Sequence, residues 1–197
     1  MRYLWVDAGN DPNYVTGNRH GIDGYFMPLA DSRTTQAKLI EIKFRGYAAG
    51  VYVGHGWWQP LSATALVEKV WTEFLKVRVP ALRLQVNMEQ HDPDYIIDVL
   101  EGLRAKSATL PLSWTMEGMQ GGWASSIAAR VVAAKVRAVP QGFWGADGQI
   151  EGDWAEDAVL RDLTKAGYPE SSVSLFYDAE NLPRGWQGYA FTQGRLP

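Results

Sequence analysis

The sequence predicts an α/β protein in which parallel strands close into a barrel. Along the 197 residues, short apolar segments rich in aromatic and β-branched residues alternate with segments of helical spacing, which is typical of repeated strand–helix units. Eight strand segments recur at a spacing of roughly 24 residues, and this number favours a closed barrel. An open doubly wound sheet is the alternative, but the first strand is not followed by the Gly-rich phosphate loop that would support it.

The eight predicted strands share apolar, aromatic or β-branched residues and end at Gly or a polar residue. They span Tyr3–Ala8, Ile22–Met27, Ala48–Gly54, Leu82–Met88, Leu110–Thr115, Ala134–Val139, Val173–Tyr177 and Gly188–Thr192. Several are apolar nearly throughout, which is typical of strands buried on both faces.

Helical spacing is found in five segments between these strands. They are Thr35–Arg45, Ser62–Lys76, a segment that opens at Asp92–Pro93, Met119–Ala129 and Asp153–Ala166. In the first, Ile40 and Phe44 share one face, and Gly46 is a good residue to end the helix. In the second, Ser62 is a plausible N-cap and Trp71 belongs to an apolar stripe that we expect in the buried core. The inward residues of the third helix are predicted to be Ile96, Ile97, Leu100 and Leu103.

Two segments depart from a regular barrel. Residues 9–21 are too few and too rich in Asn, Gly and Pro for an ordinary first helix, and the sequence ends directly after the eighth strand. The sequence therefore predicts one domain over residues 1–197, a compact (β/α)8 TIM-like barrel with a reduced first helix and no closing helix.

Composition excludes several classes of function. The 19 Lys and Arg against 22 Asp and Glu give a net charge of −3, which disfavours a nucleic-acid surface. The absence of Cys excludes disulfides, thiolate zinc sites and Cys nucleophiles. No apolar run reaches the ~18 residues of a membrane span, and the first residues lack the apolar stretch of a signal peptide. The 9 Trp and 9 Tyr point instead to flat surfaces for a sugar or a protein partner.

Polar and aromatic residues follow the predicted strands, and in a parallel barrel such residues converge on one rim. The candidate catalytic carboxylates are Asp7, Glu89, Glu117 and Asp178. The candidate substrate-binding residues are Asn87, Trp57, Trp58, Trp114, Trp144, Trp186 and Gln187. Two carboxylates on opposite sides of a glycosidic bond can act as acid and as base or nucleophile, so this set predicts a carbohydrate site.

Several of these residues also have a plainer interpretation. Asp178 can serve to order a loop, and the Trp57–Trp58 pair can be a packing plug or a protein contact instead of a sugar platform. The three His residues are widely spaced and lack the spacing of a metal site, so neither a metal nor another cofactor is expected.

The order of these motifs resembles the GH25-type lysozymes (N-acetylmuramidases) and related glycosidase-like barrels of bacteriophages. The matching pieces are Trp5-Val6-Asp7, the run from Arg45 to Val53, Val86-Asn87-Met88-Glu89, the run from Leu110 to Thr115, and Gly185-Trp186-Gln187-Gly188-Tyr189. The resemblance implies a sugar-cleaving barrel with its acid at Glu89 and a further carboxylate at Asp7. It also shows a departure, because Asn87 stands where the family has a carboxylate, and an amide can be neither a base nor a stabilising charge.

Two hypotheses follow. In the first, the protein is a phage glycoside hydrolase that acts on peptidoglycan, with Glu89 as general acid and Asp7, Glu117 or Asp178 as the second carboxylate. In the second, hydrolysis is lost and the barrel is a virion component, in the tail or at the capsid, that binds glycan or a neighbouring subunit. The expected partners are cell-wall glycan and other virion proteins, with no nucleic acid and no membrane. The expected location is the virion, or release from the host cytoplasm.

Overall fold

The computed structural model describes residues 3–5, 24–29, 32–54, 61–87, 93–116, 125–140, 143–144, 150–151, 165, 167, 175–178 and 188–191. Eight strands form one sheet: β1 (Tyr3–Trp5), β2 (Gly24–Pro28), β3 (Ala48–Val53), β4 (Arg83–Asn87), β5 (Leu112–Met116), β6 (Arg137–Pro140), β9 (Leu175–Asp178) and β10 (Gly188–Phe191). The helices are α1 (Ser32–Phe44), α2 (Ala63–Val77), α3 (Pro93–Lys106) and α4 (Ser125–Ala133). The short strands β7 (Phe143–Trp144) and β8 (Ile150–Glu151) pair separately and antiparallel.

The eight strands are parallel throughout and lie in the order β6-β5-β4-β3-β2-β1-β10-β9. Each predicted strand overlaps one of them, and β1 pairs with β10, so the first predicted strand lies beside the last. From β6 to β1 each strand lies beside its neighbour in the chain, and β10 and β9 continue the sheet on the other side of β1. The two edge strands, β6 and β9, approach within 8 Å between Cα atoms, although no pairing between them is recorded in the described part of the chain.

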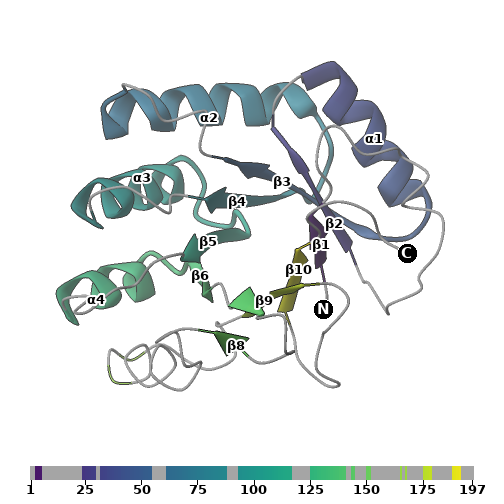
Figure 1. Cartoon of the computed structure of the whole chain (residues 1–197). Coiled ribbons are helices and arrows are strands. Elements are labelled where there is room, and N and C mark those ends of the chain that lie inside the picture. Colours follow the sequence, from purple (N-terminus) through teal and green to yellow (C-terminus); the bar gives the residue numbers. More distant parts are fainter. Residues whose placement is uncertain are drawn as a thin grey trace.

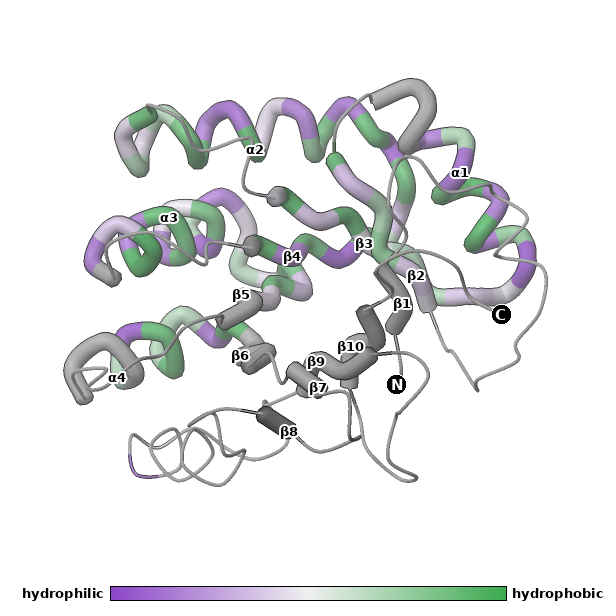
Figure 2. The backbone as a smooth tube through the Cα atoms, in the orientation of Figure 1, coloured by the Kyte–Doolittle hydropathy of each residue, from purple (hydrophilic) through white to green (hydrophobic). Residues whose placement is uncertain are grey.

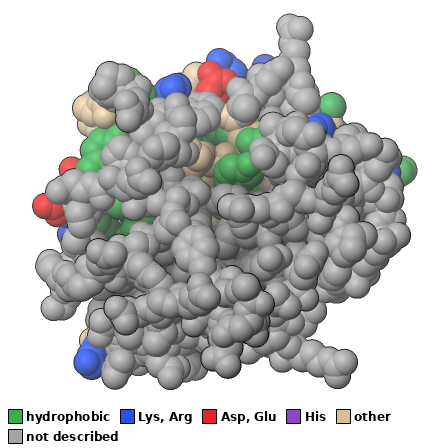
Figure 3. All heavy atoms as spheres, viewed as in Figure 1, with side chains coloured by type: hydrophobic (Ala, Val, Ile, Leu, Met, Phe, Trp, Pro, Cys, Tyr) green, Lys and Arg blue, Asp and Glu red, His purple; other side chains and the backbone are tan. Residues whose placement is uncertain are grey.

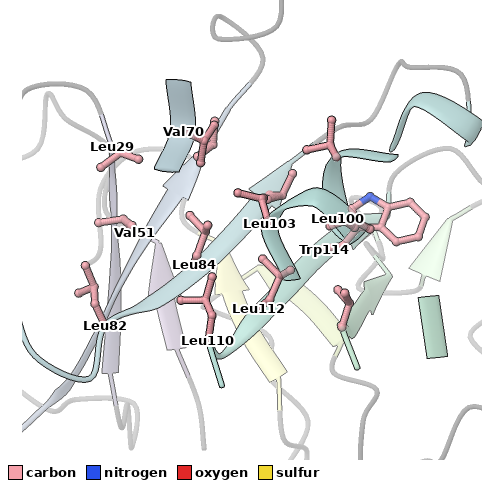
Figure 4. Packing of buried hydrophobic residues seen from close by; sticks show 14 of the residues in the cluster. Leu29, Val51, Val70, Leu82, Leu84, Leu100, Leu103, Leu110, Leu112 and Trp114 are labelled. Carbon is pink, nitrogen blue, oxygen red and sulfur yellow. The ribbon is translucent and has the colours of Figure 1, made fainter. Parts of the chain in front are cut away.

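All four described helices pack on the same side of the sheet (Figure 1). Alternate strand residues, such as Val51, Leu84 and Leu112, meet Val70 of α2 and Leu100 of α3 in one apolar cluster (Figure 4). Along α1 to α4, hydrophobic and hydrophilic residues alternate with the turns of the helix (Figure 2), as expected for helices covered on one side only. We call this side of the sheet the helix-facing side. No helix of the described chain is long and apolar enough to cross a membrane.

Local signals in the sequence place two helices correctly. Ser62 caps α2, because its Oγ accepts a hydrogen bond from the Ala65 N–H at 3.3 Å. Gly46 follows α1 with a φ of +86°, a conformation that favours glycine. In α3 the four residues predicted to face inward are all buried: Ile96, Ile97, Leu100 and Leu103.

Other helix predictions are wrong in part. The face of α1 that holds Ile40 and Phe44 is exposed, at 54% and 90%, because Leu39 and Ile42 are the residues that face the sheet. Trp71 is only partly buried and stacks on Phe74 with ring centroids 5.6 Å apart, since the apolar stripe of α2 is wider than the surface beneath it. The helix predicted from Met119 is described only from Ser125. Residues 9–21, most of the predicted helix over 153–166 and the residues after the last strand lie outside the described residues.

Arg104 of α3 forms hydrogen bonds with two of the connections that lead from a helix to the next strand. Its guanidinium donates to the carbonyl oxygens of Ala134 and Lys135, just beyond α4, at 2.7 and 2.9 Å. It also donates to carbonyl oxygens of the connection between α3 and β5: Ser107 at 3.2 Å, Ala108 at 3.1 Å and Leu110 at 2.8 Å. One side chain thus supplies hydrogen bonds to carbonyl groups of the two connections that follow α3 and α4. These contacts lie at the amino ends of β5 and β6.

Candidate functional site

The carboxyl ends of the eight strands lie at one edge of the sheet, because all eight are parallel. We call this the carboxyl edge. β4 ends there at Asn87, which pairs with Thr115 of β5, and β9 ends there at Asp178, which pairs with Phe191 of β10. The structure therefore brings the backbones of Asn87 and Asp178 to the same edge, on strands that lie on opposite sides of β1.

Most of the other predicted site residues fall outside the described part of the chain. They are Asp7, Trp57, Trp58, Glu89, Glu117, Trp186 and Gln187. Trp144 is placed in β7, which belongs to the separate two-stranded sheet. Along the chain, Glu89 follows the end of β4 by two residues, and Glu117 comes directly after β5.

The prediction that Trp114 binds substrate is corrected by its place in the core. Its side chain is 2% exposed and packs in the apolar cluster on the helix-facing side, close to Leu100 (Figure 4). The reason is the alternation of β5: Leu112 and Trp114 point toward the helices, whereas Ser113 lies on the opposite face. Trp114 is therefore a packing residue and not a platform open to a ligand.

The face of the sheet opposite the helices is also buried, and it contains polar residues. Phe26 and Gln85 are 0% exposed and Ser113 is 3% exposed, yet none of the three belongs to the helix-facing cluster. We call this the inner face. Register aligns Tyr52 with Gln85, and Gln85 with Ser113, in a lateral row of three adjacent strands. Two residues further along β4 and β5, toward the carboxyl edge, Asn87 pairs with Thr115 in register.

This polar row was missed by sequence reasoning, although a signal for it exists. In β4 the polar residues Arg83, Gln85 and Asn87 alternate with Leu84 and Val86. When a strand is buried on both faces and one of these faces is polar, the polar side chains on it are expected to be hydrogen-bonded inside the protein.

Glycine at position 50 allows the inner face to pack tightly. Gly50 pairs with Phe26, and a Cβ atom at Gly50 would overlap the Phe26 ring, with Cδ1 at 2.6 Å. The ring is fully buried, and buried side chains are generally close-packed, so a shift of the ring should be costly.

We therefore expect Gly50→Ala to lower the free energy of unfolding by about 1–3 kcal/mol, the range typical of overpacking. Urea denaturation followed by circular dichroism measures it. Gly54→Ala is the matched control, since its Cβ would meet the nearest atom at 3.8 Å, an ordinary contact. Adding Phe26→Leu to Gly50→Ala should recover part of the loss. Equal stability of the two alanine variants would contradict this account.

In the view of Figure 3, Lys, Arg, Asp and Glu side chains of the described residues lie along the rim, and hydrophobic side chains are visible both at the rim and nearer the centre. Among the described residues, the largest ion-pair cluster is on the outside, where Arg130 of α4 contacts Asp98 and Glu101 of α3 at 3.1 and 2.7 Å. The hydrogen bond from Arg130 lowers the pKa of Glu101. Within the described ranges, no three His, Asp or Glu side chains gather as metal ligands.

Comparison with known proteins places this fold in a class. No protein-family model matches the sequence, and no curated protein does. Solved structures that resemble it are catalytic domains of glycoside hydrolases with a TIM-barrel-like fold.

These structures are chitinase domains from Pyrococcus furiosus. The catalytic domain of the hyperthermophilic chitinase matches with a TM-score of 0.63 and 14% identity over 96% of this chain and 75% of its own. Catalytic-site mutants of active domain 2 match with a TM-score of 0.62 and 13% identity over 89% and 71%. Such mutants complexed with chito-oligosaccharides match with a TM-score of 0.62 and 12% identity over 96% and 75%. At these identities the similarity shows a glycoside hydrolase-like fold. It supports that part of the resemblance found in the sequence, and not the lysozyme family or a phage origin.

Proposed function

We propose that this protein is a glycoside hydrolase that cleaves an N-acetylhexosamine glycan at the carboxyl edge of a closed (β/α)8 barrel. Glu89 acts as the general acid, and Asp7, Glu117 or Asp178 supplies the second carboxylate. Chitin and peptidoglycan both contain N-acetylglucosamine, so the chitinase neighbours and the lysozyme resemblance favour the same sugar unit. The phage setting, with its virion partners, rests on the sequence resemblance alone.

The observation that carries this proposal is the polarity of the carboxyl edge and of the row beneath it. Parallel barrels hold their active sites at this edge. Here the edge begins with Asn87 and Asp178, on strands from the two sides of β1. The burial of Phe26 and Gln85, on the face without described helices, supports a sheet that curls round on itself. The approach of β6 to β9 within 8 Å supports the same closure.

A second candidate function is glycan binding without hydrolysis, and one residue favours it. Asn87 ends β4 with a neutral amide, paired with the neutral Thr115. Amides and hydroxyls are good hydrogen-bond partners for sugar hydroxyl groups, but they cannot serve as the acid or base of a glycosidase.

Incubation of the whole chain with chitotetraose (the tetramer of N-acetylglucosamine), and separately with purified peptidoglycan, tests both candidates. New reducing ends measure hydrolysis, and isothermal titration calorimetry with chitotetraose and peptidoglycan fragments measures binding. Hydrolysis of either glycan supports the first candidate. Binding with no new reducing ends supports the second, and the absence of both contradicts the two together.

A further inference from the structure

Tyr52 holds a distinctive position on the inner face. Its neighbours in β3, Val51 and Val53, are 0% exposed and belong to the helix-facing cluster, so Tyr52 lies on the opposite face. In register it stands beside Gln85, which is fully buried. Tyr52 itself is only partly buried. Among the aromatic side chains that the structure describes on the inner face, Phe26 is closed off and Tyr52 reaches solvent.

The Tyr52 ring lies beside Gly54, at the end of β3. Gly54 is two residues further along the same face, toward the carboxyl edge. A Cβ atom placed there would meet Tyr52 Cε2 at 3.8 Å, the one contact within 4 Å among the described residues. The ring therefore extends along the strand toward the carboxyl edge, and the glycine places no side chain of its own beside it.

We propose that Tyr52 is a glycan-contacting residue, whose ring provides a flat apolar surface for a pyranose ring at the carboxyl edge. This inference rests on the proposed function and deepens it. A pyranose has a face of C–H groups that packs on an aromatic ring, while its hydroxyl groups require polar partners. Tyr52 supplies the aromatic surface, and the buried polar row of Gln85 and Ser113 lies next to it in register. Gln85 and Ser113 are buried, so they hold β4 and β5 in place beside β3, the strand that carries the Tyr52 ring.

Calorimetric titration with chitotetraose tests this role in Tyr52→Ala and Tyr52→Phe. Tyr52→Ala should weaken binding roughly tenfold, which corresponds to about 1.4 kcal/mol. Tyr52→Phe keeps the ring and should stay within about threefold of the wild type. Gly54→Leu leaves the ring in place but fills the space beside it, and we expect it to weaken binding as well.

Tyr47→Ala is the matched control, since Tyr47 precedes the same strand at its amino end and packs edge-on against Tyr25 with centroids 5.0 Å apart. It should leave the affinity per folded molecule unchanged. If Tyr52→Ala fails to fold, Gly54→Leu and Tyr52→Phe decide the question. The role of Tyr52 would be overturned, and the proposed function left standing, if Tyr52→Ala and Gly54→Leu both bind with wild-type affinity. If Tyr52→Ala does not fold, wild-type affinity in Gly54→Leu alone has the same meaning. A wild-type chain that neither binds nor cleaves chitotetraose or peptidoglycan would overturn both.

Discussion

Replacing Glu89 by Gln should lower kcat for glycan hydrolysis by roughly 10²-fold or more, since general acid catalysis is typically worth ~10²–10⁴. A glutamine has the size of a glutamate and can still hydrogen-bond a sugar, but its amide N–H is far too weak an acid to protonate the leaving oxygen. The affinity for substrate should therefore survive, so that kcat falls while the dissociation constant of chitotetraose stays near that of the wild type. Initial rates of reducing-end release and calorimetric titration measure the two quantities.

Glu73→Gln is the matched control for this experiment. Glu73 lies on α2, in an exposed ion pair with Lys76 at 2.6 Å, far from the carboxyl ends of the strands along its own helix. The same chemical change at that position should leave kcat unchanged. Full activity in Glu89→Gln would remove Glu89 from the mechanism and leave the other carboxylates as the candidates.

The Arg104→Met variant should lose about 3 kcal/mol of unfolding free energy, because hydrogen bonds from charged groups each contribute about 1.5–3 kcal/mol and part of the loss is recovered by water. The guanidinium donates to five carbonyl oxygens, two beyond α4 and three after α3. Burial also lowers the pKa of Arg104. Methionine retains the apolar stem, so the change isolates the hydrogen bonds. The midpoint of urea denaturation measures the loss.

Two further variants sharpen the result. Arg104→Lys keeps the charge but has no planar fork to reach both groups of carbonyls, and should recover only part of the stability. Arg130→Met removes an arginine of the outer ion-pair cluster and should cost much less, because exposed pairs contribute little. A loss in Arg104→Met no larger than in Arg130→Met would contradict the role assigned to Arg104.

The strands were predictable from the sequence because a parallel sheet buried on both faces leaves apolar runs that end at Gly or polar residues. The start of α2 was predictable because Ser62 supplies a local hydrogen bond. The buried face of α1 was not, since two apolar pairs compete there. Leu39 and Ile42 face the sheet, whereas Ile40 and Phe44 fit a helical period equally well. Only the sheet decides between the two pairs.

The candidate site was predictable in outline and not in its detail. Strand ends such as Asn87 and Asp178 meet at one edge because parallel strands share a direction, which the alternating pattern already implies. Period-two alternation does not say which face of a strand meets the helices. For that reason Trp114 was assigned to the site although it lies in the core, and Tyr52 was overlooked although it lies on the inner face.

The position of β1 has a consequence for how the chain folds. β1 pairs on one side with β2, its neighbour in the chain, and on the other with β10, so that Tyr3 stands opposite Tyr189. During synthesis, β2 to β6 and the four helices between them can assemble from contacts between consecutive units, whereas the second edge of β1 stays unpaired until β10 has been made. Contacts between such distant segments are costly in loop entropy and slow to form. We therefore expect the pairing of β1, β10 and β9 to be the late step of folding, and the half of the sheet from β2 to β6 to be protected first in pulsed hydrogen exchange.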